Sequence, residues 1–244
     1  MVKERPVMVN EAACYRCQHC LAVCPQGAVS IFGLEPEDSL RLEGPWTDPD
    51  GLERLMKGRR TVRRYRQDNV SPAVIQRLLD VAWHAPTGLN TQPVLFTVID
   101  DREKMAAFRA EVLAGLTRLV REGTMREDDF FAGFPRQWQE RGNDVLFRGA
   151  PHMVVASAPA DGVSPVPDCF IALTYLELFA ASLGLGTVWS GMAKNVIDNL
   201  LPKMRTKLGI PENHTIGFVL VFGYPHVHYA RTVQRGPANV KVVE

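Results

Sequence analysis

Four cysteines near the start of the chain have a spacing that is typical of metal-cluster ligands. Cys14, Cys17, Cys20 and Cys24 form a C-x2-C-x2-C-x3-C run that ends at Pro25, and bacterial-type iron-sulfur clusters are held by thiolates at this spacing. Three thiolates at short, fixed intervals can surround one edge of a cluster, and the proline ends the loop. The run therefore predicts a 4Fe-4S cluster and one-electron transfer.

A zinc site is the alternative for the same cysteines. Zinc sites usually pair two cysteines with a second, distant pair, or use histidines three to five residues apart. His19 lies inside the run, and we expect its side chain to point elsewhere. The spacing favours an iron-sulfur cluster over zinc, and both over a disulfide framework.

The role of Cys24 is left open by the sequence. In two-cluster ferredoxins the fourth cysteine of such a run ligates the other cluster, but this chain has one run and, far downstream, a lone Cys169. Either Cys24 closes a single cluster, or two chains each supply half of a two-cluster module, or the site is degenerate and holds no cluster.

Length and composition limit the class of protein. The chain has 244 residues, of which 46% are hydrophobic, and a net charge of +1. This length allows one large domain with a small appendage, and the low charge gives no general attraction to nucleic acids or membranes. The five cysteines fit a reducing interior, and neither a signal peptide nor a run of about 18 apolar residues is evident. We therefore expect a cytoplasmic protein that binds neither membranes nor nucleic acid.

Three parts can be distinguished along the sequence. Residues 1–32 form a cysteine segment, in which residues 28–32 have the pattern of a short strand. Residues 33–51 are rich in proline, glycine and acidic residues, a composition typical of a linker. Residues 52–244 form the main domain, in which helical and strand patterns alternate.

The hydrophobic periodicity of the main domain predicts an α+β class, with helices flanking a sheet. Helices are expected at residues 71–83, 105–120, 168–183 and 194–208, the last broken at Pro202, and buried core strands at residues 94–99, 152–157 and 215–222. The helix at 168–183 is apolar nearly all round and is expected to be buried. Residues 123–148 have no clear period and are expected to be mobile or to depend on a partner.

An arginine-rich stretch at residues 59–65 suits an anionic ligand. Alternate residues of an extended backbone share a face, so Arg59, Thr61 and Arg63 would offer two guanidinium groups and a hydroxyl to a phosphate. A solvated basic strand or a nucleic-acid patch is the alternative. The low net charge and the absence of interleaved aromatic residues weaken the nucleic-acid interpretation.

Two further loops have the composition to contact a flat heterocycle. The loop Pro86–Pro93 is bounded by prolines, and Gly88 lets its backbone approach a ligand closely. The loop Gly184–Gly191 leaves a helix through glycines and brings backbone amides to an exposed turn. Taken singly, the first is a polar loop and the second is a helix C-cap that leads into a strand.

Together, the arginine stretch and the two loops resemble the nitroreductase family of FMN-dependent oxidoreductases. The resemblance covers about residues 52–236 and includes the phrases Phe147–Pro151 and Phe222–Pro225. It implies a central, mainly antiparallel sheet flanked by helices, in an intertwined homodimer with two flavin pockets, each lined by both chains. Members with an N-terminal ferredoxin-like segment form a subgroup, and this chain departs from those that carry two cysteine runs.

The resemblance also implies which residues contact FMN. Arg59, Arg60, Thr61 and Arg63 would hold the phosphate, the ribityl chain and the pyrimidine edge; Pro86, Thr87, Gly88 and Asn90 would come from the partner chain; Ser190 and Gly191 would face flavin N5 and O4; and Arg235, with Arg231, would complete the phosphate site. No catalytic side-chain base is required. His84 and His152 lie in apolar runs and are expected to be core histidines, and Cys169 is expected to be inert packing.

The activity implied by the family is reduction of an electron-poor small molecule, such as a nitroaromatic, a quinone or an enone. NAD(P)H is the common electron donor in the family, whereas a cluster would let a ferredoxin-type donor supply electrons singly. The alternatives are an electron-relay or redox-sensing protein without small-molecule turnover, and a same-fold reductive dehalogenase or flavin-degrading enzyme. In the last case residues 123–148 would line the substrate.

Overall fold

A computed structural model of the chain describes residues 8, 10–44 and 47–243. Most of the start of the predicted cysteine segment, residues 45–46 of the predicted linker and residue 244 lie outside the described residues. The helices are α1 (His19–Ala22), α2 (Pro49–Gly58), α3 (Pro72–Trp83), α4 (Arg102–Arg121), α5 (Phe134–Arg141), α6 (Pro165–Ser182), α7 (Gly191–Asn195) and α8 (Lys203–Lys207). Single 3-10 turns lie at η1 (Glu11–Ala13), η2 (Pro36–Asp38) and η3 (Gly88–Asn90), and η4 (Val196–Leu200) is a π-helical turn.

Four strands form one antiparallel sheet in the main domain. The strands β1 (Leu95–Ile99), β2 (His152–Pro159), β3 (Gly186–Trp189) and β4 (His214–Gly223) have the order β1-β2-β4-β3. β2 pairs with β1 and β4, and β3 pairs with β4, each time antiparallel. The predicted α+β class with an antiparallel sheet flanked by helices is therefore confirmed.

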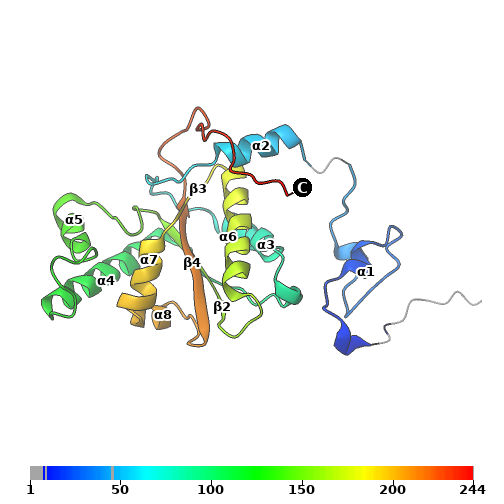
Figure 1. Cartoon of the computed structure of the whole chain (residues 1–244), viewed down its shortest axis with the longest axis horizontal. Coiled ribbons are helices and arrows are strands. Elements are labelled where there is room, and N and C mark those ends of the chain that lie inside the picture. The colour runs from blue at the N-terminus through cyan, green and yellow to red at the C-terminus, as the bar shows by residue number, and fades with distance from the viewer. Residues whose placement is uncertain (1–7, 9, 45–46, 244) are drawn as a thin grey trace, which may run out of the picture.

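Helices cover both faces of the sheet (Figure 1). α4, α5, α7 and α8 lie on one side, and α3 and α6 lie on the other. Side chains alternate across a strand, so Met153 and Val155 of β2 enter the core on the α4 side, whereas Val154 and Ala156 enter the core on the α6 side. Because β2 and β4 are buried on both faces, their sequences are nearly continuous apolar runs.

The ends of two helices follow from the local sequence as predicted. α3 begins after Ser71, whose Oγ accepts a hydrogen bond from the Val74 amide at 3.4 Å, and proline in the first turn loses no helical hydrogen bond. α6 ends where Gly184 has a φ of 75°. The amide of Leu185 then donates to the carbonyl of Ala180 at 2.9 Å, which closes the helix.

Two strand predictions need correction. Residues 28–32 are not a strand, because positive φ angles at Phe32 and Gly33 turn the chain back, so that Ile31 makes a single bridge to Leu34. The strand predicted at 94–99 is present as β1 but is not fully buried. β1 is an edge strand of the sheet, and Leu95 remains exposed.

Helical and loop regions also differ from expectation. α6 is not buried all round, because Phe170, Ile171 and Tyr175 are 38%, 37% and 40% exposed on its outer face. Residues 123–148, expected to be mobile or to depend on a partner, include α5, whose Phe134 is buried in the core on the α4 side. His84 is exposed at the end of α3, where its Nδ1 bonds the carbonyl of Asp80, so it is not a core histidine.

The cysteine segment lies beside the main domain rather than within its core (Figure 1). A hydrogen bond joins the two parts, from Asn90 Nδ2 to the carbonyl of Tyr15 at 3.0 Å. Within the part of the chain that the structure describes, no helix combines the length and the hydrophobicity needed to cross a membrane.

Cys169 packs in the core, as predicted. Its close packing against the sheet requires a glycine in β4. Cys169 is fully buried, and this burial raises the pKa of its thiol to about 11. A Cβ placed on Gly217 would lie 2.2 Å from the Cβ of Cys169. Gly217 occupies a register shift between β2 and β4, opposite Ala156 and Ser157, where the extra residue lets α6 approach the sheet closely.

We therefore expect Gly217→Ala to lower the free energy of unfolding by about 1–3 kcal/mol, the usual cost of overpacking a core. The added methyl cannot fit unless α6 moves away from β4. Urea denaturation followed by circular dichroism measures the change. Gly58→Ala is the control, because a Cβ there meets no atom within 4 Å. Equal stability of Gly217→Ala and wild type would contradict this packing.

His152 is a buried core histidine, as predicted. Its side chain is fully buried, its Nε2 accepts a hydrogen bond from the Val70 amide at 2.9 Å, and its ring packs on Phe222. Desolvation lowers the pKa of His152 below its ordinary value. The imidazole is therefore neutral in the folded chain at neutral pH.

The lowered pKa of His152 makes stability depend on pH. Below an ordinary histidine pKa of about 6.5, the unfolded chain binds a proton that the folded chain rejects, so stability falls as the pH drops. The loss is at most about 1.4 kcal/mol per pH unit. We expect wild type to lose more stability than His152→Gln between pH 7 and pH 5.5 in urea denaturation. Parallel pH profiles would contradict the assignment.

Candidate active site

The arginine stretch runs along the sheet edge beside β3. The Val62 amide donates to the carbonyl of Thr187 at 2.9 Å, and Thr61 forms a parallel bridge with the same strand residue. Tyr65 forms an antiparallel bridge with Pro225. Val62 and Tyr65 are buried, so the intervening arginines are held at the surface by a fixed backbone.

Arg59 is anchored to α6 by a partly buried ion pair. Its Nη1 lies 3.1 Å from Oε1 of Glu177, and the same oxygen accepts a hydrogen bond from Thr187 Oγ1 at 2.8 Å. The two side chains are 25% and 9% exposed, respectively. Glu177 thus ties the arginine stretch and β3 to the second half of α6.

Two hollows flank the arginine stretch. The first, called the Arg59 hollow, has a volume of about 460 Å³ and is lined by Arg54, Arg59, Arg60, residues 184–187, His228 and Tyr229 among others. The second, called the Arg148 hollow, has a volume of about 400 Å³ and is lined by Arg63, Arg64, Asn143, Asp144, Arg148 and His226 among others. Arg59 and Arg63, which we expected on one face, line different hollows.

Ser190 and Gly191 stand at the junction of β3 and α7. The Ser190 amide donates to Val219, its hydroxyl donates to the carbonyl of Leu146 at 2.7 Å, and its Oγ accepts from the Ala193 amide. The donors of Ser190 are therefore used within the chain. Gly191 is exposed, and a Cβ there would meet just Phe218, at 3.5 Å, which leaves room for a ligand against its backbone.

The loop Pro86–Pro93 is fixed by internal hydrogen bonds. The Gly88 amide donates to Asp168 Oδ1 at 3.1 Å, and Thr87 Oγ1 accepts from the Gln92 amide at 3.0 Å. A Cβ on Gly88 would lie 3.0 Å from Val163 Cγ1. The loop therefore rests on the first turn of α6.

The loop and the arginine stretch contact α6 at two separate levels in one chain. Gly88 bonds Asp168, and Arg59 pairs with Glu177. These partners are nine residues apart, or about 14 Å along a helix at 1.5 Å per residue. No hydrogen bond or ion pair links the loop with the arginine stretch within the described residues. Within one chain, Thr87, Gly88 and Asn90 therefore lie apart from Arg59.

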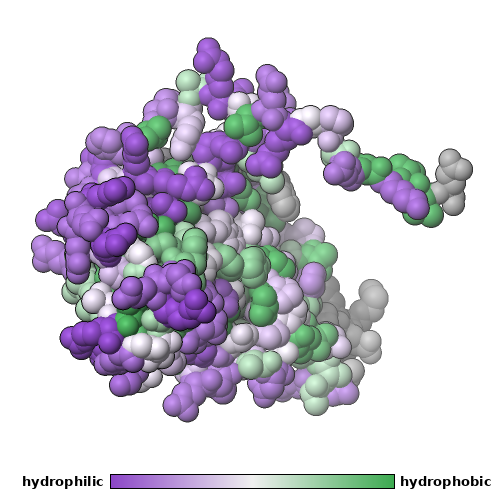
Figure 2. All heavy atoms as spheres, turned by 60° about the vertical axis from the view of Figure 1, so that its left-hand side comes forward, coloured by the Kyte–Doolittle hydropathy of each residue, from purple (hydrophilic) through white to green (hydrophobic). Residues whose placement is uncertain are grey.

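The C-terminal arginines lie in an extended, exposed tail. Arg231 and Arg235 have no ion pair within the described part of the chain. The tail passes the arginine stretch at Tyr229, whose Oη donates to the carbonyl of Thr61 at 3.5 Å. Figure 2 shows the end of the tail projecting from the body of the chain.

The four cysteines do not converge in this structure. Cys17 and Cys20 are exposed, and within the described residues no group of three or more His, Cys, Asp or Glu side chains is arranged to hold a metal ion. His19, which we expected to point away, has its Nδ1 2.8 Å from Cys17 Sγ. This contact lowers the pKa of Cys17 and raises the pKa of His19.

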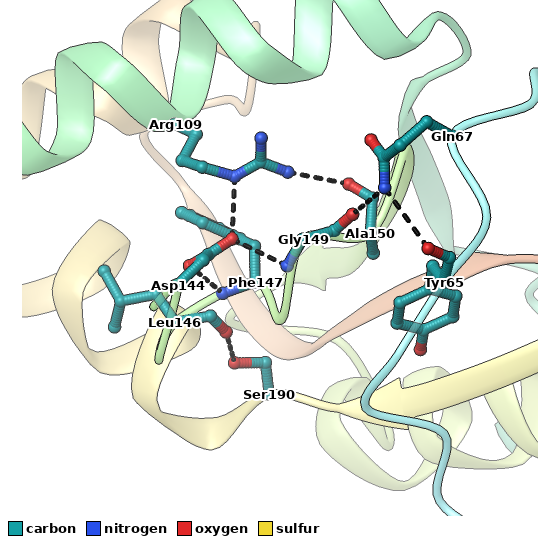
Figure 3. Close-up of polar contacts among 9 residues, drawn as sticks. All are labelled: Tyr65, Gln67, Arg109, Asp144, Leu146, Phe147, Gly149, Ala150 and Ser190. Carbon is teal, nitrogen blue, oxygen red and sulfur yellow. Dashed lines mark hydrogen bonds and ion pairs between the residues drawn. The ribbon is translucent and has the colours of Figure 1, made fainter. Parts of the chain in front are cut away.

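The turn at residues 144–150, of which the sequence indicated only the motif Phe147–Pro151, lies next to Ser190 (Figure 3). The Asp144 carboxylate binds Arg109 and two backbone amides of the turn. Leu146 of the same turn accepts the hydrogen bond from Ser190. The signal for this turn was an aspartate three residues before the motif Phe147–Pro151, within a stretch that has no period.

Comparison with known proteins decides the family. A family model described as the nitroreductase family matches residues 56–224, which is more than half of the chain. The chain belongs to the nitroreductase family. The matched region contains the sheet, the loop Pro86–Pro93 and the arginine stretch.

Individual relatives and solved structures are consistent with this family. The nitroreductase NfnB of Mycolicibacterium smegmatis is 28% identical over 206 residues, covering 74% of this chain and 86% of the relative. An iodotyrosine deiodinase of Thermotoga neapolitana is 27% identical over 141 residues, covering 55% of this chain and 70% of the relative. A nitroreductase structure with bound FMN from Desulfitobacterium hafniense has a TM-score of 0.60 at 25% identity, covering 78% of this chain and 98% of its own.

Proposed function

We propose that this FMN-dependent oxidoreductase reduces an electron-poor small molecule, such as a nitroaromatic, a quinone or an enone, with electrons from NAD(P)H or a ferredoxin-type donor. The observation that carries the proposal is the Arg59 hollow, which is lined by three arginines and by the glycine-containing residues 184–187 within a nitroreductase-family fold. The similarity to the nitroreductase NfnB supports the reaction class. The deiodinase relative makes reductive dehalogenation the second candidate.

The residues of the Arg59 hollow fit the phosphate of FMN. Guanidinium groups bind phosphate through paired, charge-assisted hydrogen bonds, and Arg54, Arg59 and Arg60 line this hollow. Arg59 has five N–H donors, so it can bind a phosphate oxygen while Glu177 holds it in place. Gly186 lets β3 pack closely against Val62 of the arginine stretch, since a Cβ there would lie 2.5 Å from Val62 Cγ2.

When bound, FMN would supply hydride or single-electron transfer, and the chain would bind and orient it. The exposed Gly191 amide is the donor available for the ring, because the donors of Ser190 are used inside the chain. Trp189, Phe218 and Phe170 form an aromatic cluster beside Gly191. This cluster would exclude water from one side of the ring.

We further propose that two copies of the chain form the active enzyme. The exposed outer face of α6, called the α6 face, carries Val166, Phe170, Ile171 and Tyr175, and large apolar surfaces of this kind mark interfaces. A second copy can bring its loop Pro86–Pro93 to the Arg59 hollow, which a single chain does not do. Pro86, Thr87, Gly88 and Asn90 would then complete the flavin site.

Arg60 offers the sharpest test of the flavin site. Unlike Arg59, it has no ion pair within the described residues, so its removal leaves no buried acid without a partner. Loss of one charge-assisted hydrogen bond, worth about 1.5–3 kcal/mol, predicts that Arg60→Ala weakens FMN binding about 10- to 150-fold. Titration of flavin-free protein with FMN, followed by fluorescence, measures it. Arg118→Ala on α4 is the control, and equal weakening in both variants would contradict the site.

The iron-sulfur cluster is a separate proposal, supported by the spacing of Cys14, Cys17, Cys20 and Cys24 alone. Because these cysteines do not converge in this structure, we assign no step of the reaction to a cluster. Iron and acid-labile sulfide, assayed on anaerobically purified protein, test the proposal. Four irons per chain are expected, and less than one iron per chain would contradict it.

A further inference from the structure

A buried carboxylate builds the turn at residues 144–150. Asp144 Oδ2 accepts from Arg109 Nε at 2.7 Å and from the Gly149 amide at 2.9 Å, and Oδ1 accepts from the Phe147 amide at 2.8 Å. Arg109 Nη2 also donates to the carbonyl of Ala150 at 2.8 Å. Figure 3 shows these contacts enclosing the turn from both sides.

The turn holds Arg148 in a strained conformation. Its φ is 56°, in the left-handed region that glycine adopts without cost. The hydrogen bonds to Asp144 from residue 147 on one side and residue 149 on the other impose this conformation. Strained residues persist where the surrounding structure over-determines them, and they concentrate at binding sites.

Arg148 belongs to a hollow whose three arginines are not neutralised by an ion pair within the described residues. The Arg148 hollow is also lined by Arg63, Arg64 and His226. Within the described residues, none of its three arginines forms an ion pair. Its acidic residue, Asp144, is already neutralised by Arg109. Such a concave, basic surface attracts an anion.

The two sides of the hollow are joined, so its shape is fixed. Gln67 Nε2 donates to the carbonyl of Gly149 at 3.0 Å and contacts the carbonyl of Tyr65 at 3.4 Å. This bond ties the segment that carries Arg63 and Arg64 to the turn that carries Arg148. The backbone segments that carry the three arginines are therefore held around one space.

We propose that the Arg148 hollow binds the phosphate or carboxylate group of a reactant, with Arg148 as the main contact. Arg59 and Arg60, expected at the flavin phosphate, line the other hollow, whereas Arg63, also expected at FMN, lines this one. The proposal therefore assigns Arg63 to the reactant instead of the flavin phosphate. The assignment to a reactant rests on the proposed function, whereas the binding of an anion does not. An arginine is kept at a glycine-like φ because its guanidinium group is needed there.

Isothermal titration calorimetry of the FMN-saturated protein tests this site, with inorganic pyrophosphate as the phosphate probe and citrate as the carboxylate probe, at low salt. We expect one site per chain, and at least tenfold weaker binding in Arg148→Gln. Arg121→Gln, at the exposed end of α4, is the control and should bind like wild type. Tighter pyrophosphate binding assigns the site to a phosphate-bearing donor, and tighter citrate binding assigns it to a carboxylate-bearing acceptor.

The variant Arg148→Gly distinguishes a loss of anion binding from a loss of stability. Glycine suits a φ of 56°, so this variant should melt at or above the wild-type temperature and still lose anion binding. No saturable binding, equal binding by the Arg148 variants, or binding only to flavin-free protein would overturn the inference. A chain that binds no FMN would overturn the proposed function, while the same titrations on that chain would still decide the anion site.

Discussion

Replacing Asp144 by alanine is expected to lower the free energy of unfolding by about 3–5 kcal/mol, the cost of breaking a buried ion pair from one side. The side chains of Asp144 and Arg109 are 2% and 10% exposed. The substitution leaves the Arg109 guanidinium buried without a counter-charge, and it removes the acceptor of two backbone amides in the turn. Urea denaturation of the two proteins under matched conditions measures the loss.

Asp128→Ala is the matched control for this prediction. Asp128 also pairs with an arginine, Arg126, through two hydrogen bonds of 2.7 and 2.9 Å, but the two side chains are 69% and 84% exposed. An exposed pair contributes about 0–1 kcal/mol, so the control should lose little stability. Similar losses in the two variants would show that the burial of Asp144 does not determine the effect.

Introducing a charge on the α6 face is expected to separate the dimer. Ile171 lies at the centre of this face, between Phe170 and Tyr175. Ile171→Asp would bury an unpaired carboxylate between two copies, at a cost of about 3 kcal/mol or more, which corresponds to at least a hundredfold weaker dimer. Because the loop Pro86–Pro93 would come from the partner, FMN binding should fall with the dimer. Sedimentation velocity at several concentrations measures the first effect, and flavin retention measures the second.

Leu40→Asp is the control for the α6 face. Leu40 lies outside the main domain and is 88% exposed, so a charge there should change neither assembly nor flavin content. A dimer that persists in Ile171→Asp would show that the interface lies on a surface other than the α6 face. A monomeric variant that keeps its FMN would contradict the contribution of the partner loop.

The parts of the fold that depend on local chemistry were predictable from the sequence. Ser71 with Pro72 predicted the start of α3, Gly184 predicted the end of α6, and the apolar runs at residues 152–157 and 215–222 predicted the two central strands. Periodicity overestimated the burial of β1 and α6. An apolar run has the same composition whether it is covered by another element of the chain or by a second molecule. Composition therefore does not show which of these covers β1 and α6.

The parts that depend on contacts distant in sequence were not predictable. Asp144 bonds Arg109, which is 35 residues away, and this pair organises a stretch that shows no period of its own. The division of the arginine stretch between two hollows depends on how Val62 pairs with Thr187 and how Gln67 reaches Gly149. His19 was expected to point away from Cys17, but a two-residue separation in a turn brings the side chains together.

The shared flavin site is tested by one chromatographic run that measures molar mass by light scattering and flavin by absorbance. The protein is first incubated with excess FMN and then freed of unbound ligand. We expect a particle of twice the 27.2 kDa of one chain, with one FMN bound per chain. A colourless particle with the mass of a single chain would contradict it.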